Sequence, residues 1–198
     1  MGWWGHDVLS GDAPLDVLSW FAADLGLQDP SSLDVYPDGT IDDPAARDQV
    51  CRRFTTATLD SLTALVYELA GVEDDTTLTL KASSWAPEAS EQAVAAYRAE
   101  QDRHVRVVWQ VLAVVAMAAG AALSDEVRAT MIAAGVEDDW AASNPARRAA
   151  MDRYVACLRD YRNGVPTALS SATLADAVVR AEQVGHVGLL NVDPPAAG

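Results

Sequence analysis

Apolar residues recur three and four positions apart along most of this chain, the spacing of one face of an α-helix. The first such stripe lies between Asp12-Ala13-Pro14 and Gly26, residue types that start and stop helices. Its members are Leu15, Leu18, Phe21, Ala22 and Leu25. The pattern predicts a first helix of about three turns.

The same kind of pattern continues toward the C-terminus. A second helical region runs from Asp43-Pro44 to Gly71, and the threonine-rich segment 55–58 indicates a bend or a break within it. Comparable start and stop residues bound the remaining apolar stripes. These predict helices at 88–123, with Gly120 as a candidate interruption near its end, at 124–134, at 145–162 and at 173–184.

One segment departs from the helical pattern. Residues 33–42 alternate between apolar and polar around Pro37-Asp38-Gly39, which is typical of a tight turn between two strands. The sequence therefore predicts a mainly α fold, a single-domain helical bundle over residues 1–190 with a small β-hairpin near residues 33–42. Residues 191–198 are expected to form a flexible C-terminal tail.

One apolar stretch, Val107 to Leu123, has two interpretations. Its seventeen residues contain Gln110 as their one polar side chain, and the length is at the short limit for a membrane-spanning helix. Seven of the seventeen are alanine or glycine, which suits a central helix packed closely by others. A buried Ala/Val-rich helix is favoured, and a membrane span is the alternative.

The charge of the chain is strongly negative and unevenly distributed. Against 29 Asp and Glu stand 14 Lys and Arg, which gives a formal net charge of −15 over 198 residues. Residues 1–46 contain nine aspartates and no Lys, Arg or Glu. Such a surface repels the phosphate backbone, so direct binding of nucleic acid is not expected, whereas a basic partner would be attracted.

The helix predicted at 145–162 has the opposite local charge. Its basic residues are Arg147, Arg148, Arg153, Arg159 and Arg162. It either binds an acidic partner or, as we favour, docks within the molecule beside the acidic N-terminal region or is simply solvated.

The first sixteen residues hold an unusual combination of side chains: Trp3, Trp4, His6, Asp7, Asp12 and Asp16. In a functional interpretation these side chains line a pocket, with His6 and Asp7 as a base or as metal ligands. In a structural one the tryptophans fill the core, Asp12 caps the first helix, and Asp16 adds favourable charge to its first turn. The structural interpretation is favoured, because capping accounts for Asp12 and one histidine is a weak ligand set.

The opening of the chain also resembles an uncharacterised bacterial family, a domain of unknown function. Chains of that family begin Met-Gly-x-Trp-Gly and continue through a short loop to an Asp and then to Leu-Asp on the first helix. The matching positions are Met1, Gly2, Trp4, Gly5, Asp12, Leu15 and Asp16. Beyond them the likeness extends to a helical layout with a late tryptophan, Trp140, and a closing amphipathic helix. The resemblance implies a shared fold and carries over no catalytic residue.

Other motifs match known sites only in part. Asp34, Asp38 and Asp42 fit a calcium-binding loop, but Ala45 stands where its bidentate glutamate belongs, which favours a turn with solvated aspartates. Two glutamates at 88 and 91 fit half of a magnesium-binding arrangement whose second carboxylate pair does not follow. No Ser or Cys stands in a glycine-framed nucleophile motif. The sequence thus predicts no catalytic residue, no resident metal and no cofactor.

These observations favour a small acidic protein that binds another macromolecule. It would act as a regulator, an inhibitor or an immunity-type factor on a basic protein partner, and its aspartates would mimic the phosphates of nucleic acid in one version of this hypothesis. The candidate binding residues are the N-terminal cluster above together with Asp34, Asp38, Asp42 and Asp43.

Two alternatives stay open. The first is a metal-assisted hydrolase that uses His6, Asp7, Asp12 and Asp16. The second is a homo-oligomer built through the Ala-rich helix. The N-terminus lacks the basic region of a signal peptide, so a cytoplasmic location without membrane contact is expected.

Overall fold

The computed structural model describes residues 7–9, 12–33, 41–73, 77, 90–167 and 169, and within these ranges it contains helices and no strand. The elements are α1 (Asp12–Asp24), the 3-10 helix η1 (Pro30–Leu33), α2 (Pro44–Thr56), α3 (Leu59–Leu69), α5 (Ser90–Ala119), α6 (Asp125–Val136), α7 (Asp139–Ser143) and α8 (Pro145–Asp160). The predicted mainly α fold is confirmed.

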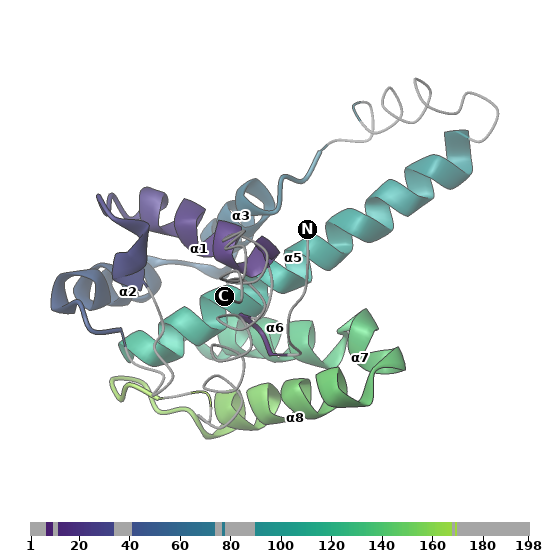
Figure 1. Ribbon diagram of the computed structural model, residues 1–198. Helices are drawn as coiled ribbons and strands as arrows, with labels where there is room; N and C mark the ends of the chain where they lie inside the picture. The colour runs from purple at the N-terminus through teal and green to yellow at the C-terminus, as the bar shows by residue number, and fades with distance from the viewer. Residues whose placement is uncertain are drawn as a thin grey trace, which may run out of the picture.

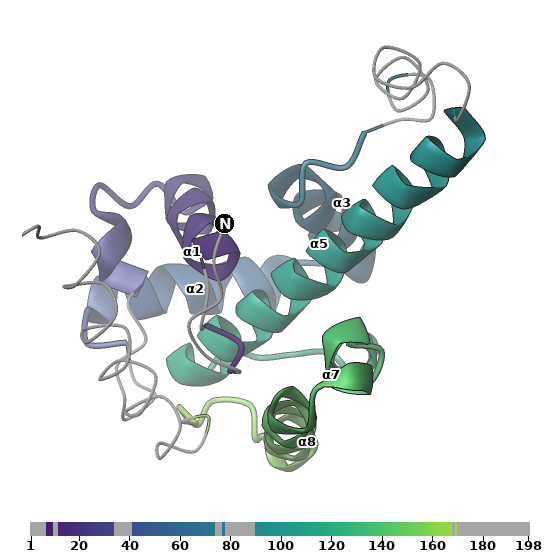
Figure 2. The ribbon, with the colours of Figure 1, turned by 45° about the vertical axis from the view of Figure 1, so that its right-hand side comes forward.

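Helix α5 is the axis of the structure. At 30 residues it is about 45 Å long, and the helices α1, α2 and α3 lie on one side of it while α6, α7 and α8 lie on the other (Figure 1 and Figure 2). Its first half extends beyond these helices and is largely exposed, whereas its second half is buried between the two groups. The second half of α5 is therefore the centre on which the two groups of helices pack.

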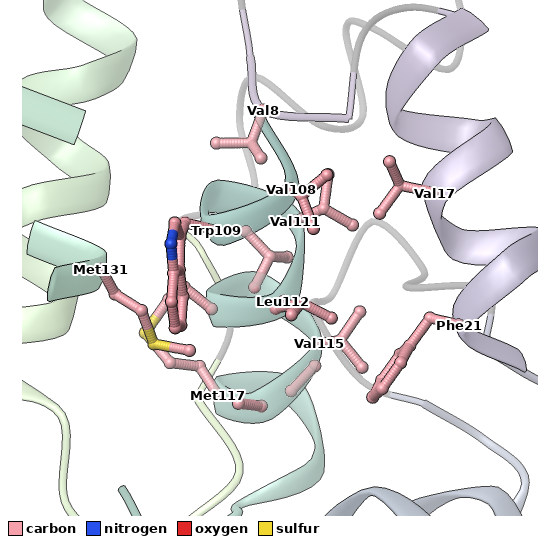
Figure 3. Packing of buried hydrophobic residues seen from close by; sticks show 14 of the residues in the cluster. Val8, Val17, Phe21, Val108, Trp109, Val111, Leu112, Val115, Met117 and Met131 are labelled. Atoms are coloured by element: carbon pink, nitrogen blue, oxygen red, sulfur yellow. The ribbon is translucent and has the colours of Figure 1, made fainter. Parts of the chain in front are cut away.

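The core surrounds residues 107–119 of α5, all of which are buried. Figure 3 shows Val111 and Val115 facing Phe21 of α1, while Trp109 on another face lies against Met131 of α6. Small side chains at several positions of this segment allow the flanking helices to approach closely. The prediction of a buried core helix is confirmed, and no helix in the described part of the chain is both long and apolar enough to cross a membrane.

The second helical region divides at its threonines, as the sequence indicated. Thr58 begins α3 with a capping box, in which its Oγ1 accepts from the Ser61 backbone N–H at 3.2 Å and the Ser61 Oγ accepts from the Thr58 N–H at 3.0 Å. These two hydrogen bonds satisfy backbone N–H groups at the start of α3 that would otherwise pair with carbonyls of a continuous helix. Helix α3 therefore begins at the Thr58 cap and does not continue α2.

Helix α5 ends four residues earlier than the apolar run predicts. Gly120 takes a φ of +77°, a left-handed conformation that stops the helix at Ala119 instead of Leu123. After α8 the chain returns to this point, where the Asn163 side chain bonds both the N–H and the C=O of Leu123 at 3.1 Å. Ala121 and Leu123 are thus buried in a connection and not in a helix.

The predicted β-hairpin near residues 33–42 is not supported. Leu33 ends the 3-10 helix η1, residues 41–43 have no regular secondary structure, and residues 34–40 lie outside the described residues. The 3-10 turn starts where Asp29 Oδ1 accepts from the Ser31 N–H at 2.9 Å. Leu33 and Ile41 are both fully buried, so their apolar character reflects contact with the core. The helix predicted at 173–184 and the tail 191–198 also lie outside the described residues.

Replacing Gly135 by alanine tests the packing of α6 on α8. A Cβ at this position would lie 2.6 Å from two ring atoms of Tyr154, whose hydroxyl is held by the Met131 carbonyl at 2.9 Å. We expect Gly135→Ala to lower the free energy of unfolding by about 1–3 kcal/mol in denaturant titration. On an open helix the same change is stabilising by up to about 1 kcal/mol, so an increase would contradict this packing.

Candidate functional site

The structure places only some of the predicted site residues. Trp3, Trp4, His6, Asp34 and Asp38 lie outside the described residues. Asp12 is the first residue of α1, and nothing is described of its side chain. The described members are Asp7, Asp16, Asp42 and Asp43. They do not gather in one place: Asp43 caps α2, Asp16 lies on α1, and Asp7 contacts α8.

Asp7 is held by two arginines of α8. Its carboxylate accepts from Arg153 Nη2 at 3.2 Å, and its backbone carbonyl accepts from Arg147 Nη1 at 3.0 Å. Only 7% of Asp7 is exposed. Arg147 and Arg153 thus dock beside the acidic N-terminal region, as expected, and give Asp7 a structural role, while Arg159 and Arg162 are exposed.

Arg147 is the most deeply buried charge in the described structure, with 1% of its surface exposed. Its Nη2 donates to Gln110 Oε1 and to Asp138 Oδ2, both at 2.8 Å, and its Nε donates to Asp138 Oδ2 at 3.2 Å. The guanidinium also lies 5.3 Å from the centre of the Trp140 ring. A buried guanidinium is tolerated only when its donors are satisfied in this way.

These contacts lower the pKa of Asp138. Burial alone would raise its pKa, but the hydrogen bonds and charge of Arg147, with further hydrogen bonds from Gln110 and from the Ala141 N–H, hold the pKa below its ordinary value. Asp138 also caps α7 through that Ala141 N–H at 2.8 Å. The Asp138 carboxylate is therefore ionised, and its oxygens bind Arg147, Gln110 and the Ala141 N–H.

A cavity of about 380 Å³ lies beside this buried network, between α5 and α7. Four of its charged lining residues pair with each other, Arg106 with Asp139 and Arg147 with Asp138, and the fifth, Arg103, pairs with Glu100 on the same helix. An anion or cation entering it would have to displace a partner that is already in place. This cavity is a poor candidate for a binding site.

The stronger candidate is a groove of about 650 Å³ between α1, α3 and α5, named here the α1–α3 groove. Helix α1 lines it along nearly its whole length, α3 with its C-terminal end, and α5 with the start of its buried half. Its apolar lining includes Val17, Leu65, Leu69, Val107 and Val108. Figure 1 shows α1 and α3 on the same side of α5, and both contact α5 more extensively than they contact each other.

The charge of the α1–α3 groove is acidic. Among its described lining residues Asp16, Asp24 and Glu68 carry charge, and none is Lys or Arg. Asp24 binds Arg53 of α2 at 3.1 Å, while Asp16 and Glu68 are exposed and make no ion pair with the described residues. The groove also receives the C-terminal end of α3, whose macrodipole adds negative potential.

An exposed tryptophan stands at the edge of this groove. Trp20 of α1 is 53% exposed, although tryptophan usually buries most of its surface. Trp20 follows Asp16 and Val17 by four and three residues, and all three line the groove, so Trp20 lies on the flank of α1 that faces it. Large aromatic side chains in such positions are the typical anchors of protein interfaces.

The described residues do not form a metal site. No group of three or more His, Cys, Asp or Glu side chains in the described part of the chain could hold a metal ion. His104, which lines the α1–α3 groove, contacts Glu100 one turn away, with Nε2 at 3.2 Å from Oε1. The chemistry that the groove offers is therefore an apolar surface edged by carboxylates.

Comparisons of this chain with protein-family models, with curated proteins and with solved structures find no match. The resemblance of the opening residues to a bacterial family stays a prediction. Function has to be argued from the contacts and charges of the chain itself.

The sequence analysis missed the burial of Arg147 and the α1–α3 groove. Arg147 lies four and seven residues before Met151 and Tyr154, on the buried stripe of α8, so its position on that stripe was a signal that the residue is buried. The groove combines residues from three helices distant in the sequence, and the one signal for it was Trp20, a large aromatic residue outside the buried stripe of α1.

Removing the buried guanidinium should be costly. We expect Arg147→Met to destabilise the protein by about 3–5 kcal/mol, because the Asp138 carboxylate would stay buried without its partner. Arg159→Met, at an exposed position of the same helix, should change stability by less than about 0.5 kcal/mol. Denaturant titration measures both, and equal effects would contradict the network.

The stabilisation by Asp138 should depend on pH in a defined direction. Because its folded-state pKa lies below the ordinary value, its contribution is complete above pH about 4 and is lost as the pH falls through the folded-state pKa. We expect Asp138→Asn to be less stable than the wild type by a constant amount near neutral pH, and this difference to shrink below pH about 4. Unfolding titrations across this range measure it, and a difference that does not shrink would refute the ionised pair.

Proposed function

We propose that this protein acts by binding a basic protein partner in the α1–α3 groove. The observation that carries the proposal is the groove itself, an apolar surface of three helices whose described charged lining residues are all acidic. It would act there as a regulator, an inhibitor or an immunity-type factor, roles that need binding without chemistry.

The two acids at the groove edge support a cationic partner. Asp16 and Glu68 are exposed, and Glu68 lies in the last turn of α3, where a negative charge is unfavourable for the helix itself. A lysine or arginine of a partner would relieve this repulsion. The net charge of −15 would also speed the approach of a basic protein.

The apolar lining supports a partner with a hydrophobic anchor. Apolar surface in the groove, together with the half-exposed indole of Trp20, is removed from water when a partner binds. Charge then guides the encounter, while burial of this surface supplies most of the affinity. This division fits a specific partner better than general solubility of the chain.

The alternative of a metal-assisted hydrolase has less support. Asp7 is held by Arg147 and Arg153, and His6 lies outside the described residues. The mimicry of nucleic acid also stays a prediction, because Asp34 and Asp38 lie outside the described residues.

Site-specific photo-crosslinking tests the proposed function. A photoreactive residue replaces Ala23, which is exposed and lines the groove, or Ala156, which is exposed on α8 and serves as the control position. In a lysate of the source organism we expect a basic protein to crosslink at position 23 and not at 156, with less product at high salt.

Charge variants complete this experiment. Asp16→Asn with Glu68→Gln should reduce the crosslink, and Asp152→Asn with Asp160→Asn, an equal change of charge on α8, should leave it unchanged. Equal crosslinking at both positions, equal effects of both double variants, or no crosslinked protein would overturn the proposed function.

A further inference from the structure

We propose that the occupant of the α1–α3 groove is an amphipathic helix of the partner, with an apolar stripe flanked by lysine or arginine. This inference rests on the proposed function and adds the conformation of the bound segment. It follows from the backbone of the groove walls, from the shape of the groove and from the placement of its charges.

The walls of the groove are helical. Their described residues belong to α1, to α3 with the Ala70-Gly71 turn that ends it, and to α5. The backbone N–H and C=O groups inside a helix are bonded to each other, so they cannot pair with an extended peptide. A bound strand would bury its own backbone groups without partners, whereas a bound helix satisfies them internally.

The turn at the end of α3 does not change this. The N–H of Ala70 donates to Val66 O at 2.8 Å, and the N–H of Gly71 donates to Glu68 O at 3.0 Å. Both groups are used to close the helix. The N–H groups of this turn are therefore closed to a partner, and the groove offers it mainly side chains.

The shape of the groove fits a helix of about three turns. The lining residues of α1 extend from Ala13 to Asp24, a distance of about 17 Å along the axis, and include Trp20. Since α1 and α3 both pack on α5 and contact each other little, a helix laid between them would contact all three. Its apolar residues would recur three and four positions apart to meet Val17, Leu65 and Val108.

The charges on the groove walls predict which residues flank the apolar stripe of that helix. Asp16 lies on the α1 wall and Glu68 on the α3 wall, so cationic side chains are expected on both flanks of the apolar stripe. Asp24 already binds Arg53 and contributes less. An acidic helix would be repelled at both edges.

Binding of two synthetic peptides to the full-length protein tests this inference. The first has leucines at helical spacing flanked by lysines over roughly four turns, and the second has the same composition in an order that has no apolar stripe. We expect the first to bind at least about 10-fold more tightly in fluorescence anisotropy, and to gain helical circular dichroism in the complex.

Variants of the protein locate the binding site. Trp20→Ala should weaken binding of the first peptide by about 10-fold or more, and the Asp16→Asn, Glu68→Gln double variant should weaken it and reduce its dependence on salt. The Asp152→Asn, Asp160→Asn control should bind like the wild type. Equal affinity for both peptides, or binding without a gain of helix, would overturn the inference.

The two experiments fail independently. If a basic protein crosslinks at position 23 and the amphipathic peptide does not compete with it, the proposed function stands and the helical occupant is refuted. If the peptide binds as expected and no basic protein crosslinks, the groove accepts a basic helix but the proposed function is refuted.

Discussion

The second half of α5 is the constraint on which the rest of the structure depends, because it is buried between two groups of helices and carries the polar side chain of Gln110. A buried amide needs partners. Gln110 Nε2 donates to Ala134 O at 2.8 Å and to Asp138, and Gln110 Oε1 accepts from Arg147. Asp138 caps α7, and Arg147 stands in the first turn of α8 behind the Asn144 cap. One amide therefore fixes how α6, α7 and α8 sit on α5.

The two sides of α5 use charge differently. On the side of α6 to α8, basic groups are consumed by the fold: Arg147 binds Asp138, Arg153 binds Asp7, and Arg148 bonds the carbonyls of α7. On the side of α1 to α3, Asp16 and Glu68 face the α1–α3 groove. Three of the four arginines of α8 are thus used within the fold, while Asp16 and Glu68 are exposed at the groove. This separation is what makes the groove a candidate for recognition.

The sequence predicted features that depend on neighbouring residues and missed those that depend on packing. Helix starts at Asp43 and Ser124 and the split near Thr58 follow from capping, which is local. The end of α5 was left open between Gly120 and Leu123, because hydropathy continues past Gly120, and the left-handed glycine stops the helix at Ala119. The alternation near Leu33 suggested strands, but burial of separate side chains produces the same pattern. The α1–α3 groove is formed by residues of α1, α3 and α5 together, so the apolar stripe of no single helix predicts it.

The contact between Asp7 and Arg147 joins positions 140 residues apart in the sequence. Such a contact closes a very long loop, which costs more chain entropy than the short connections between neighbouring helices. During synthesis the first residues emerge long before α8, and in that interval the segment around Val8 has no arginines to hold it. The last helix of the described fold thus holds the first described residues in place, and this contact can form only after α8 has been synthesised.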